Sequence, residues 1–379
     1  MAVTACFVTR NHAETLRRAI RSVAGLANEI VVVDTGSTDD TLLVAAEASA
    51  RVVPFVWADD FAAACNAAVA AATGDWILWI NPDEELERVG LPLLTAAAAD
   101  PGLFAWRVRV RQETHADRPG HGTLGWEYRL FRRDPAVQYI GRLHPEFVTT
   151  LGDLAASRGL SVASAEAVIR RHAYLSTPTA DRMRWVIRLL EAELRDRPGQ
   201  VGYMIELGRN YLWLNDPRGH EVLAHAAEAV NRLAEASVPP SPWVGSLIEY
   251  LLSVSPHFSR TLVTRETARA WAARWFGRTP PVVWAVAGER YAAKDYWAAL
   301  PLLESLVQMG RTGEYIAGHG FSTDIIGPAA IQNLGLCYLQ LSRWDDARTC
   351  FTQLFNHPVQ DGPARQGANL ALLQQRPAD

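Results

Sequence analysis

The chain of 379 residues has little of several features that mark specialised proteins. Only four cysteines are present, and their spacing fits no metal-binding motif. Cys6 and Cys65 lie in apolar surroundings, and free buried thiols are typical of a reducing compartment. No run of about 18 apolar residues is free of charges, so we expect no transmembrane segment. Because the N-terminus also lacks a basic segment followed by a cleavage site, we expect a soluble, cytoplasmic protein.

A charge excess of one sign is also absent. The 37 Lys and Arg residues and 41 Asp and Glu residues give a net charge of −4, which gives no indication of nucleic-acid binding. Hydrophobic residues make up 49% of the chain and charged residues 21%, so the composition is globular and a disordered chain is excluded. At about 100–200 residues per domain, the length predicts two domains.

Residues 1–112 alternate strand-like and helix-like segments. Apolar, β-branched runs indicate strands buried on both faces, and residues with helical spacing lie between them. Repeated strand–helix units with short connections predict an α/β fold with a doubly wound, mostly parallel sheet. The polar stretch 112–125 is expected to be a loop. The expected strands are 3–9, 29–34, 51–55, 76–80, 103–111, 126–131 and 137–140.

From residue 177 onward the pattern is helical. A glycine followed three positions later by tyrosine recurs at 207–211, 287–291 and 334–338. Glycine lets two helices approach closely, and an aromatic ring fills the gap above it. The last unit matches a tetratricopeptide repeat, but the distance between units differs from the usual ~34 residues. A helical domain with recurring small–aromatic packing therefore stays open as an alternative.

The strand 29–34 ends in a carboxylate, Asp34, and Gly36 permits a tight turn after it. In open α/β sheets ligands bind beyond the carboxyl ends of the strands, so Asp34 is placed to contact a ligand such as a base or a ribose. Asp39 and Asp40 begin the next predicted helix. Acidic residues in a first turn stabilise the helix dipole, which is the alternative role for both.

A second carboxylate cluster, NPDEE at 81–85, follows the strand 76–80. Hard divalent cations such as Mg²⁺ or Mn²⁺ take oxygen ligands, commonly one or two carboxylates together with substrate phosphates. An ion held here would connect the protein to a nucleotide diphosphate. A solvated acidic loop is the alternative.

A third region combines arginines with a histidine and a glutamate. The arginines of YRLFRR (128–133) have the fork geometry that suits phosphate oxygens. His144 is a candidate metal ligand or diphosphate contact, and Glu146 is a candidate to accept a proton from an acceptor. Single histidines and glutamates are more often structural, and that alternative stays open for both.

Together these motifs resemble family-2 glycosyltransferases with the GT-A fold, in particular the bacterial branch in which tetratricopeptide-like helices follow the catalytic domain. The resemblance covers most of residues 1–176 and keeps the order of the family's motifs. It implies a GT-A glycosyltransferase domain at 1–176 and an all-α, TPR-like helical domain at 177–379. The matching segments are TRN (9–11), EIVVVDTGSTDDT (29–41), WADDF (57–61) with Asn66, GDWILWINPDEEL (74–86), YRLFRR (128–133), GRLHPE (141–146) and RHAY (171–174).

The resemblance implies a metal-dependent, inverting glycosyltransferase, similar to hexosyltransferases, that moves a sugar from a UDP- or GDP-type nucleotide-sugar donor to an acceptor. Asp83 would ligate Mn²⁺ or Mg²⁺ directly. His144 would act at the metal and the diphosphate, as a ligand or a catalytic residue, and Glu146 would be the catalytic base. The implied nucleotide contacts are Thr9, Asn11, Asp34, Asp39 and Asn81.

The partners follow from the same resemblance. The acceptor is expected to be a protein, a peptide or a glycan. The helical domain is expected to bind that acceptor or another subunit, which includes a homodimer formed through this domain.

Two positions depart from the family pattern. Asn81 replaces the first acid of the Asp-x-Asp motif, and its amide forms hydrogen bonds but carries no charge. Cys65 stands where the branch usually has arginine, which removes a phosphate contact. These departures leave open a catalytically degenerate GT-A domain that acts as a nucleotide-sugar-binding or protein-interaction scaffold. A nucleotidyltransferase is disfavoured because no glycine-rich, basic phosphate loop follows the first strand.

Overall fold

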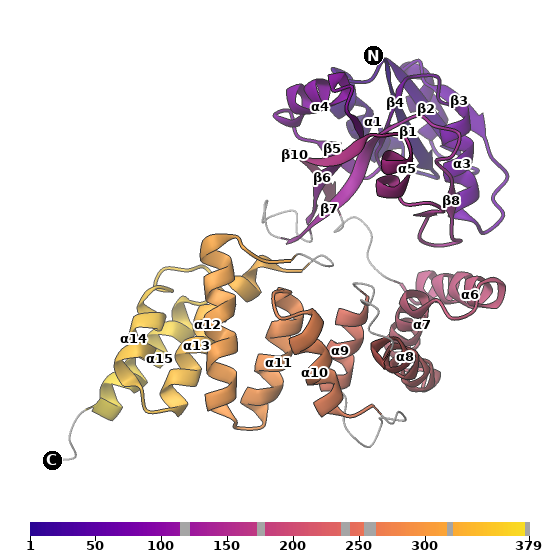
Figure 1. Ribbon diagram of the computed structural model, residues 1–379. Coiled ribbons are helices and arrows are strands. Elements are labelled where there is room, and N and C mark those ends of the chain that lie inside the picture. Colours follow the sequence, from indigo (N-terminus) through magenta and orange to yellow (C-terminus); the bar gives the residue numbers. More distant parts are fainter. Residues whose placement is uncertain (114–121, 173–178, 236–242, 254–262, 317–320, 376–379) are drawn as a thin grey trace. The chain divides into compact units, whose positions relative to one another are not determined.

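The computed structural model describes residues 1–113, 122–172, 179–235, 243–253, 263–316 and 321–375 (Figure 1). The chain divides into two compact units, Met1–Pro198 and Gly199–Asp379. The expected domain boundary at residue 176 lies outside the described residues and stays a prediction. The first predicted helix of the C-terminal half, α6 (Ala180–Asp196), is grouped with the first unit.

The first unit contains an eight-stranded mixed sheet in the order β3-β2-β1-β4-β7-β6-β10-β5. Strands β3, β2, β1 and β4 run parallel, as do β6 and β10, whereas β7 is antiparallel to both neighbours and β5 is antiparallel to β10. The predicted α/β fold with a mostly parallel sheet is therefore confirmed. The sheet strands are β1 (Val3–Thr9), β2 (Glu29–Asp34), β3 (Arg51–Pro54), β4 (Trp76–Trp79), β5 (Glu84–Leu86), β6 (Leu103–Glu113), β7 (Gly122–Arg132) and β10 (Ser161–His172).

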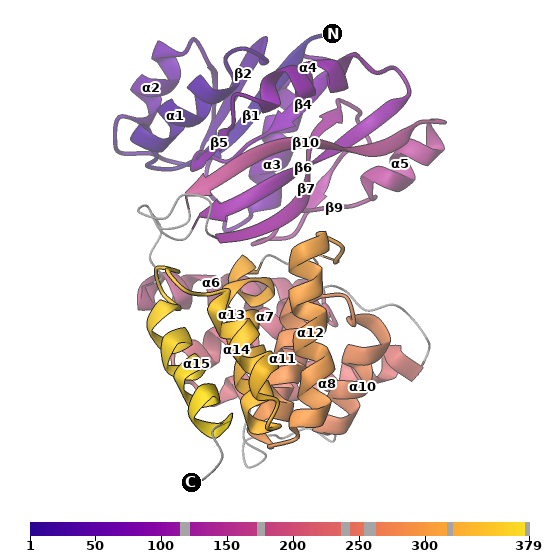
Figure 2. The same ribbon diagram turned by 90° about the vertical axis from the view of Figure 1, so that its left-hand side faces the viewer.

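Helices cover both faces of this sheet. Successive side chains of the central strands point to opposite faces, and both sets are buried. Phe7 and Val32 pack with α1, α2 and α4, whereas Cys6 and Val31 pack with α3 and α5. Figure 2 shows the long strands β6, β7 and β10 side by side. The helices are α1 (Ala13–Val23), α2 (Thr41–Glu47), α3 (Phe61–Ala71), α4 (Gly90–Ala99) and α5 (Leu151–Ser157).

The predicted loop 112–125 is wrong at both of its ends. Gln112 and Glu113 continue β6, and residues 122–125 begin β7, where they pair with β6. Only residues 114–121 of that stretch lie outside the described residues. Polar side chains are compatible with a strand here because Arg111, Gln112 and Leu124 are only partly buried. The expected strand 137–140 is reduced to β8 (Tyr139–Ile140), which pairs with β9 (Glu146–Phe147) in a separate two-stranded sheet.

The second unit is built from helices that pack as successive pairs, α7 with α8, α11 with α12 and α13 with α14 (Figure 1). The predicted helical, TPR-like half is thereby confirmed. Two hydrophobic cores run through it, one from α7 to α11 and one from α11 to α15. Its elements are α7 (Val201–Trp213), α8 (Arg218–Glu235), α9 (Val244–Ser253), α10 (Arg265–Trp275), α11 (Pro280–Ala292), α12 (Tyr296–Thr312), η2 (Thr323–Ile326), α13 (Pro328–Gln340), α14 (Trp344–Thr352) and α15 (Asp361–Gln375).

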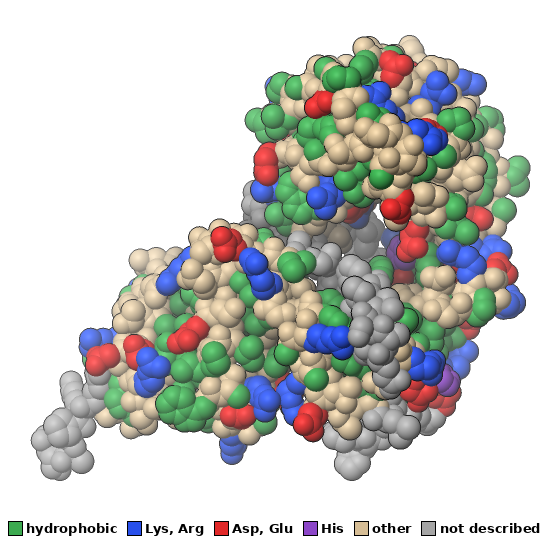
Figure 3. All heavy atoms as spheres, in the orientation of Figure 1, with side chains coloured by type: hydrophobic (Ala, Val, Ile, Leu, Met, Phe, Trp, Pro, Cys, Tyr) green, Lys and Arg blue, Asp and Glu red, His purple; other side chains and the backbone are tan. Residues whose placement is uncertain are grey.

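The distribution of charge on the surface and the state of the cysteines agree with the near-balanced charge and the low cysteine content of the sequence. Figure 3 shows acidic and basic side chains interspersed on the face that it displays, without a large field of one sign. All four cysteines are buried and unbonded to one another. Within the described ranges, no helix combines the length and apolar character needed to cross a bilayer.

Candidate functional site

The carboxyl ends of three adjacent parallel strands, β2, β1 and β4, meet at one edge of the sheet. Thr9, the last residue of β1, lies opposite Asp34, the last residue of β2. On the other side of β1, Cys6 lies opposite Trp79, so Asn81 and Asp83 continue beyond the same edge. The sequence reasoning placed these residues together because parallel strands end at a common edge.

Asp34 organises the turn that follows β2. Its carboxylate accepts hydrogen bonds from the backbone N–H groups of Gly36 at 3.2 Å and Ser37 at 3.1 Å. Gly36 has φ of +100°, a conformation that side chains disfavour, so the tight turn requires glycine. Asp34 is 8% exposed and therefore has little surface left for a ligand while this turn is closed.

Thr9 and Asn11 connect the end of β1 to the same turn. The Asn11 Oδ1 atom accepts a hydrogen bond from the Thr38 N–H at 2.7 Å, and the Asn11 N–H donates to Ser37 Oγ at 2.9 Å. The buried Thr9 hydroxyl has no hydrogen-bond partner within the described part of the chain. A buried polar atom without a partner is uncommon, and this one lies at the strand edge where a ligand is expected.

Asp39 has a structural role at the start of two helices, where its carboxylate accepts hydrogen bonds. One carboxylate oxygen accepts from the Thr41 hydroxyl and the Thr41 N–H, and the other accepts from the Ala13 N–H at 3.1 Å. These hydrogen bonds, that from the Thr41 hydroxyl first, hold the pKa of Asp39 below its ordinary value. Asp39 thus connects the starts of α1 and α2, and a nucleotide contact for it stays a prediction.

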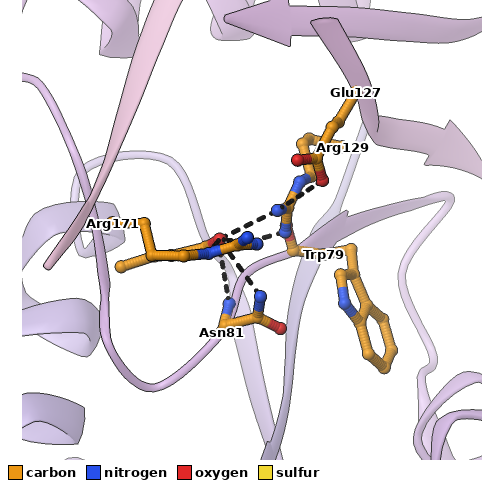
Figure 4. A network of polar contacts seen from close by, with 6 residues as sticks. Trp79, Asn81, Glu127, Arg129 and Arg171 are labelled. Carbon is orange, nitrogen blue, oxygen red and sulfur yellow. Dashed lines mark hydrogen bonds and ion pairs between the residues drawn. The ribbon is translucent and has the colours of Figure 1, made fainter. Parts of the chain in front are cut away.

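The loop after β4 is held by one fully buried carboxylate, Glu84. Figure 4 labels its partners Asn81, Arg129 and Arg171, whose side chains point toward one another. Arg129 of β7 donates two hydrogen bonds to it, at 2.8 and 3.0 Å, and Arg171 of β10 donates another at 2.8 Å. The backbone N–H and the side-chain amide of Asn81 donate to the same carboxylate at 2.8 and 3.1 Å. Burial alone would raise the pKa of Glu84, but the two guanidinium groups outweigh it and lower the pKa.

Asp83 lies next to this network and is only partly buried. Burial and the neighbouring Glu84 carboxylate raise the pKa of Asp83, against the opposing attraction of Arg171 and His12. The backbone carbonyl of Asp83 accepts a hydrogen bond from the His172 N–H at 3.1 Å, which fixes the loop to β10. Asp83 is therefore a carboxylate whose charged form a nearby cation would stabilise.

The predicted phosphate role of the arginines in 128–133 is contradicted. Arg129 is 2% exposed and pairs with Glu84 and Glu127. Arg132 donates to the backbone carbonyl of Leu103 at 2.8 Å, and Arg133 donates to that of Gly74 at 2.9 Å. All three guanidinium groups thus hold the sheet together.

His144 lies between β8 and β9, and Glu146 begins β9; α6 helps to hold this segment. The Arg142 N–H donates to the buried Glu193 carboxylate at 2.6 Å, and the Arg142 guanidinium pairs with Asp196. His144 is partly buried in the bend that follows, and Glu146 is exposed on β9. Their assigned chemistry stays a prediction.

The described residues contain no group of three or more His, Cys, Asp or Glu side chains that could hold a metal ion. A divalent ion near Asp83 would thus need ligands from a bound molecule, which is the usual arrangement for Mg²⁺ with nucleotides. The oxygen-only side chains at this edge suit such an ion.

The departures at Cys65 and Asn81 differ in their surroundings. Cys65 belongs to α3 and is 4% exposed; burial raises the pKa of its thiol, so it offers no ligand contact. Asn66 beside it forms two backbone hydrogen bonds with Tyr139, at 2.8 and 2.9 Å. The sequence did not single out Glu84, Arg171 or His12 as parts of this site. For Glu84 a signal was present, because the alternation of β5 places Glu84 on the same buried face as Leu86.

Residues 4–152 match the family described as Glycosyl transferase family 2. A TPR repeat-containing protein of Synechococcus elongatus is 36% identical over 213 residues, which cover 54% of this chain and 51% of that protein. An uncharacterized glycosyltransferase of Rickettsia felis is 37% identical over 86 residues, covering 23% and 30% respectively. The chain thus spans about half the length of the first relative and less than a third of the second. The resemblance to family-2 glycosyltransferases followed by TPR-like helices is confirmed.

Solved structures also resemble this chain. S. aureus TarS 1–349 in complex with UDP-GlcNAc has a TM-score of 0.40 and 14% identity, covering 72% of this chain and 88% of that one. Glucosyl-3-phosphoglycerate synthase from Mycobacterium tuberculosis with Mn²⁺, UDP and glucosyl-3-phosphoglycerate has a TM-score of 0.32 and 18% identity, covering 51% and 80% respectively.

Proposed function

We propose, from the match of residues 4–152 to family-2 glycosyltransferases, that the first unit transfers a hexosyl group from a UDP- or GDP-type nucleotide sugar to an acceptor, with inversion. The observation that carries the proposal is the shared edge of β2, β1 and β4. This edge gathers Asp34, Asn81 and Asp83 where ligands of open α/β sheets bind.

Asp83 is the proposed metal ligand, and Mn²⁺ or Mg²⁺ bound there would neutralise charge on the departing diphosphate. Asp34, the Asn81 amide oxygen and the Thr9 hydroxyl, which has no partner among the described residues, are proposed to contact the nucleoside. Asn11 and Asp39, which hold the adjacent turn, are the further proposed nucleotide contacts. Glu146 is proposed to take the proton from the acceptor as the acceptor forms a bond to the anomeric carbon. The bond from that carbon to the diphosphate oxygen breaks in the same step, and His144 is proposed to lie beside the diphosphate.

A thermal-shift panel of UDP-, GDP- and dTDP-sugars with and without Mn²⁺ identifies the donor, because a ligand that binds only the folded chain stabilises it. Asp83→Asn is then compared with Asp75→Asn by calorimetry. Asp75 is an exposed carboxylate at the opposite, amino end of β4 and is the matched control. We expect Asp83→Asn to weaken Mn²⁺-dependent donor binding at least 10-fold and the control to leave it unchanged. Equal affinity in the two variants would reject Asp83 as the ligand.

A second candidate is a scaffold that binds nucleotide sugar without turnover. The amide at position 81, which replaces an acid of the family motif, favours it. Donor hydrolysis followed by NMR separates the two candidates, since the enzyme hydrolyses the donor slowly with Mn²⁺ and the scaffold does not.

A further inference from the structure

Three helical glycines of the second unit occupy equivalent places in the recurring Gly-x-x-Tyr pattern, but only two are packed. A methyl group added at Gly208 would lie 2.5 Å from Leu223 Cγ, and one added at Gly335 would lie 2.7 Å from Phe351 Cε1. At Gly288 an added methyl group would meet nothing within 4 Å. The middle unit therefore leaves open the space that its neighbours fill.

Different side chains fill the space at the two packed glycines. Leu223 stands 15 positions after Gly208, and Phe351 stands 16 positions after Gly335. The corresponding positions after Gly288 hold Leu303 and Glu304. Leu303 lines the open space but lies more than 4 Å from a methyl group added at Gly288. The Glu304 carboxylate instead accepts a hydrogen bond from the Tyr338 hydroxyl at 2.7 Å, between α12 and α13.

The open space forms a pocket of about 270 Å³ between α11, α12 and α13. None of the described residues that line it is charged. Trp284, Gly288 and Tyr291 of α11 form one side, because residues three and four apart share a helix face. Leu303 and Asn333 contribute from the other two helices. No hydrogen bond joins the Asn333 amide or the Tyr291 hydroxyl to another residue in the described ranges.

We propose that this pocket binds one neutral pyranose ring of the acceptor, an assignment that rests on the proposed glycosyl transfer. The volume of about 270 Å³ lies just below the usual range for ligand sites, about 300–1,000 Å³, and suits one ring better than a nucleotide. The lack of cationic lining disfavours a phosphate. Aromatic faces carry negative potential and attract the C–H groups of a sugar ring.

The two polar groups decide between a sugar and an apolar peptide side chain. An apolar side chain in the pocket would take water from the Asn333 amide and the Tyr291 hydroxyl without replacing it, which is unfavourable. Sugar hydroxyls donate to and accept from both groups. The pocket thus combines an apolar wall with polar groups that fix orientation, as small-molecule sites do.

The test uses the full chain without donor, so it does not depend on catalysis. Saturation-transfer NMR is measured with methyl glycosides of glucose, galactose and N-acetylglucosamine, with cellotriose and maltotriose, and with N-acetyl-leucinamide as the apolar probe. Gly288→Leu fills the pocket and is compared with Gly362→Leu, a second helical glycine whose side-chain position is open. We expect at least one glycoside to bind, its affinity to fall at least fivefold in Gly288→Leu, and the control to bind like the parent chain.

Asn333→Ala gives a second measurement, in which sugar affinity falls while N-acetyl-leucinamide affinity does not. Binding of no glycoside, equal binding in Gly288→Leu, or preference for N-acetyl-leucinamide would each overturn the proposal. If glycosides bind as expected but no donor is ever turned over, the pocket stands and the proposed transfer fails. If transfer occurs with the same acceptor KM in Gly288→Leu, the transfer stands and the pocket fails.

Discussion

Glu84 and Glu47 both pair with arginine, but Glu84 has no exposed surface and the Glu47 side chain is 47% exposed. Replacing Glu84 by glutamine leaves the buried Arg129 with only the exposed Glu127 as a counter-charge, and breaking a buried pair costs about 3–5 kcal/mol. The exposed pair is worth about 0–1 kcal/mol. We therefore expect urea unfolding to show a large loss for Glu84→Gln and almost none for Glu47→Gln. Equal losses would contradict the buried network.

The same carboxylate predicts a dependence of stability on acid. The pKa of Glu84 lies below its ordinary value of 4.5 in the folded chain, so the unfolded chain binds the proton more readily. The stability that ionised Glu84 contributes is present in full above pH 4.5 and is lost as the pH falls through the lower, folded pKa. The unfolding free energies of the parent chain and Glu84→Gln should thus converge in acid. If the difference between the two unfolding free energies stays constant as the pH falls below 4.5, the stability does not depend on ionisation of Glu84.

Asn81 donates to Glu84, so aspartate at this position would add a second negative charge 3.1 Å from it. A carboxylate restores the charge of the family motif but removes a donor from a buried acceptor, which costs about 1–3 kcal/mol. For a unit of this size we expect Asn81→Asp to lower the melting temperature by roughly 2–10 °C. Asn28→Asp is the control, because the Asn28 side chain accepts from the Val3 N–H and aspartate accepts equally well. A melting temperature for Asn81→Asp as high as that of the control would show that the amide is not needed.

The strand pattern predicted where Asp34, Asn81 and Asp83 lie, since the end of each parallel strand is fixed by its apolar run. It did not predict the partners of Glu84. Arg129 and Arg171 are 45 and 87 residues away, and their pairing depends on antiparallel neighbours for which the chain carries no local signal. The arginines were accordingly assigned to phosphates, but Arg129 is buried in its ion pairs, and Arg132 and Arg133 lie at the amino end of β4, opposite the edge where ligands bind.

At the scale of elements, Phe351 holds three helices together. Its fully buried ring lies between Gly335 of α13 and Gly367 of α15, and a methyl group on either glycine would approach it to 2.7 Å or less. The ring has no free side to which it can move. We expect Gly335→Ala to destabilise the second unit by about 1–3 kcal/mol.

Gly288→Ala is the matched comparison. Its methyl group meets open space, and alanine is favoured over glycine in a helix by about 0.5–1 kcal/mol. Denaturant titration should therefore give opposite signs for the two variants, and a loss at both positions would mean that the pocket above Gly288 closes in solution.

Helix α6 shows how far element prediction reached. The helical pattern from residue 177 onward predicted a helix near this position, and the helix begins at Ala180, where Thr179 caps it by accepting from the Arg182 N–H. Its grouping with the first unit was not predictable. That grouping depends on single contacts to distant residues, such as Glu193 with the Arg142 N–H and Trp185 with Phe61.

At the scale of the whole molecule, the chain consists of two units with separate hydrophobic cores. Units with their own cores unfold as separate cooperative transitions. We expect calorimetry to resolve two transitions, of which Glu84→Gln lowers one and Gly335→Ala lowers the other. One transition that both variants shift equally would show that the units unfold together.

The wide separation of Glu84 from its partners along the chain also matters during synthesis. A ribosome adds about 5–20 residues per second, so Arg171 follows Glu84 by about 4–17 seconds. Until then β5 lacks the strand with which it pairs, and a carboxylate destined for full burial has only part of its counter-charge. The nascent first unit therefore closes late, whereas each helix pair of the second unit completes within a few dozen residues of its start. A ribosome that pauses before β10 has left the exit tunnel would hold the first unit open, and one that pauses after β10 and α6 have both emerged would not.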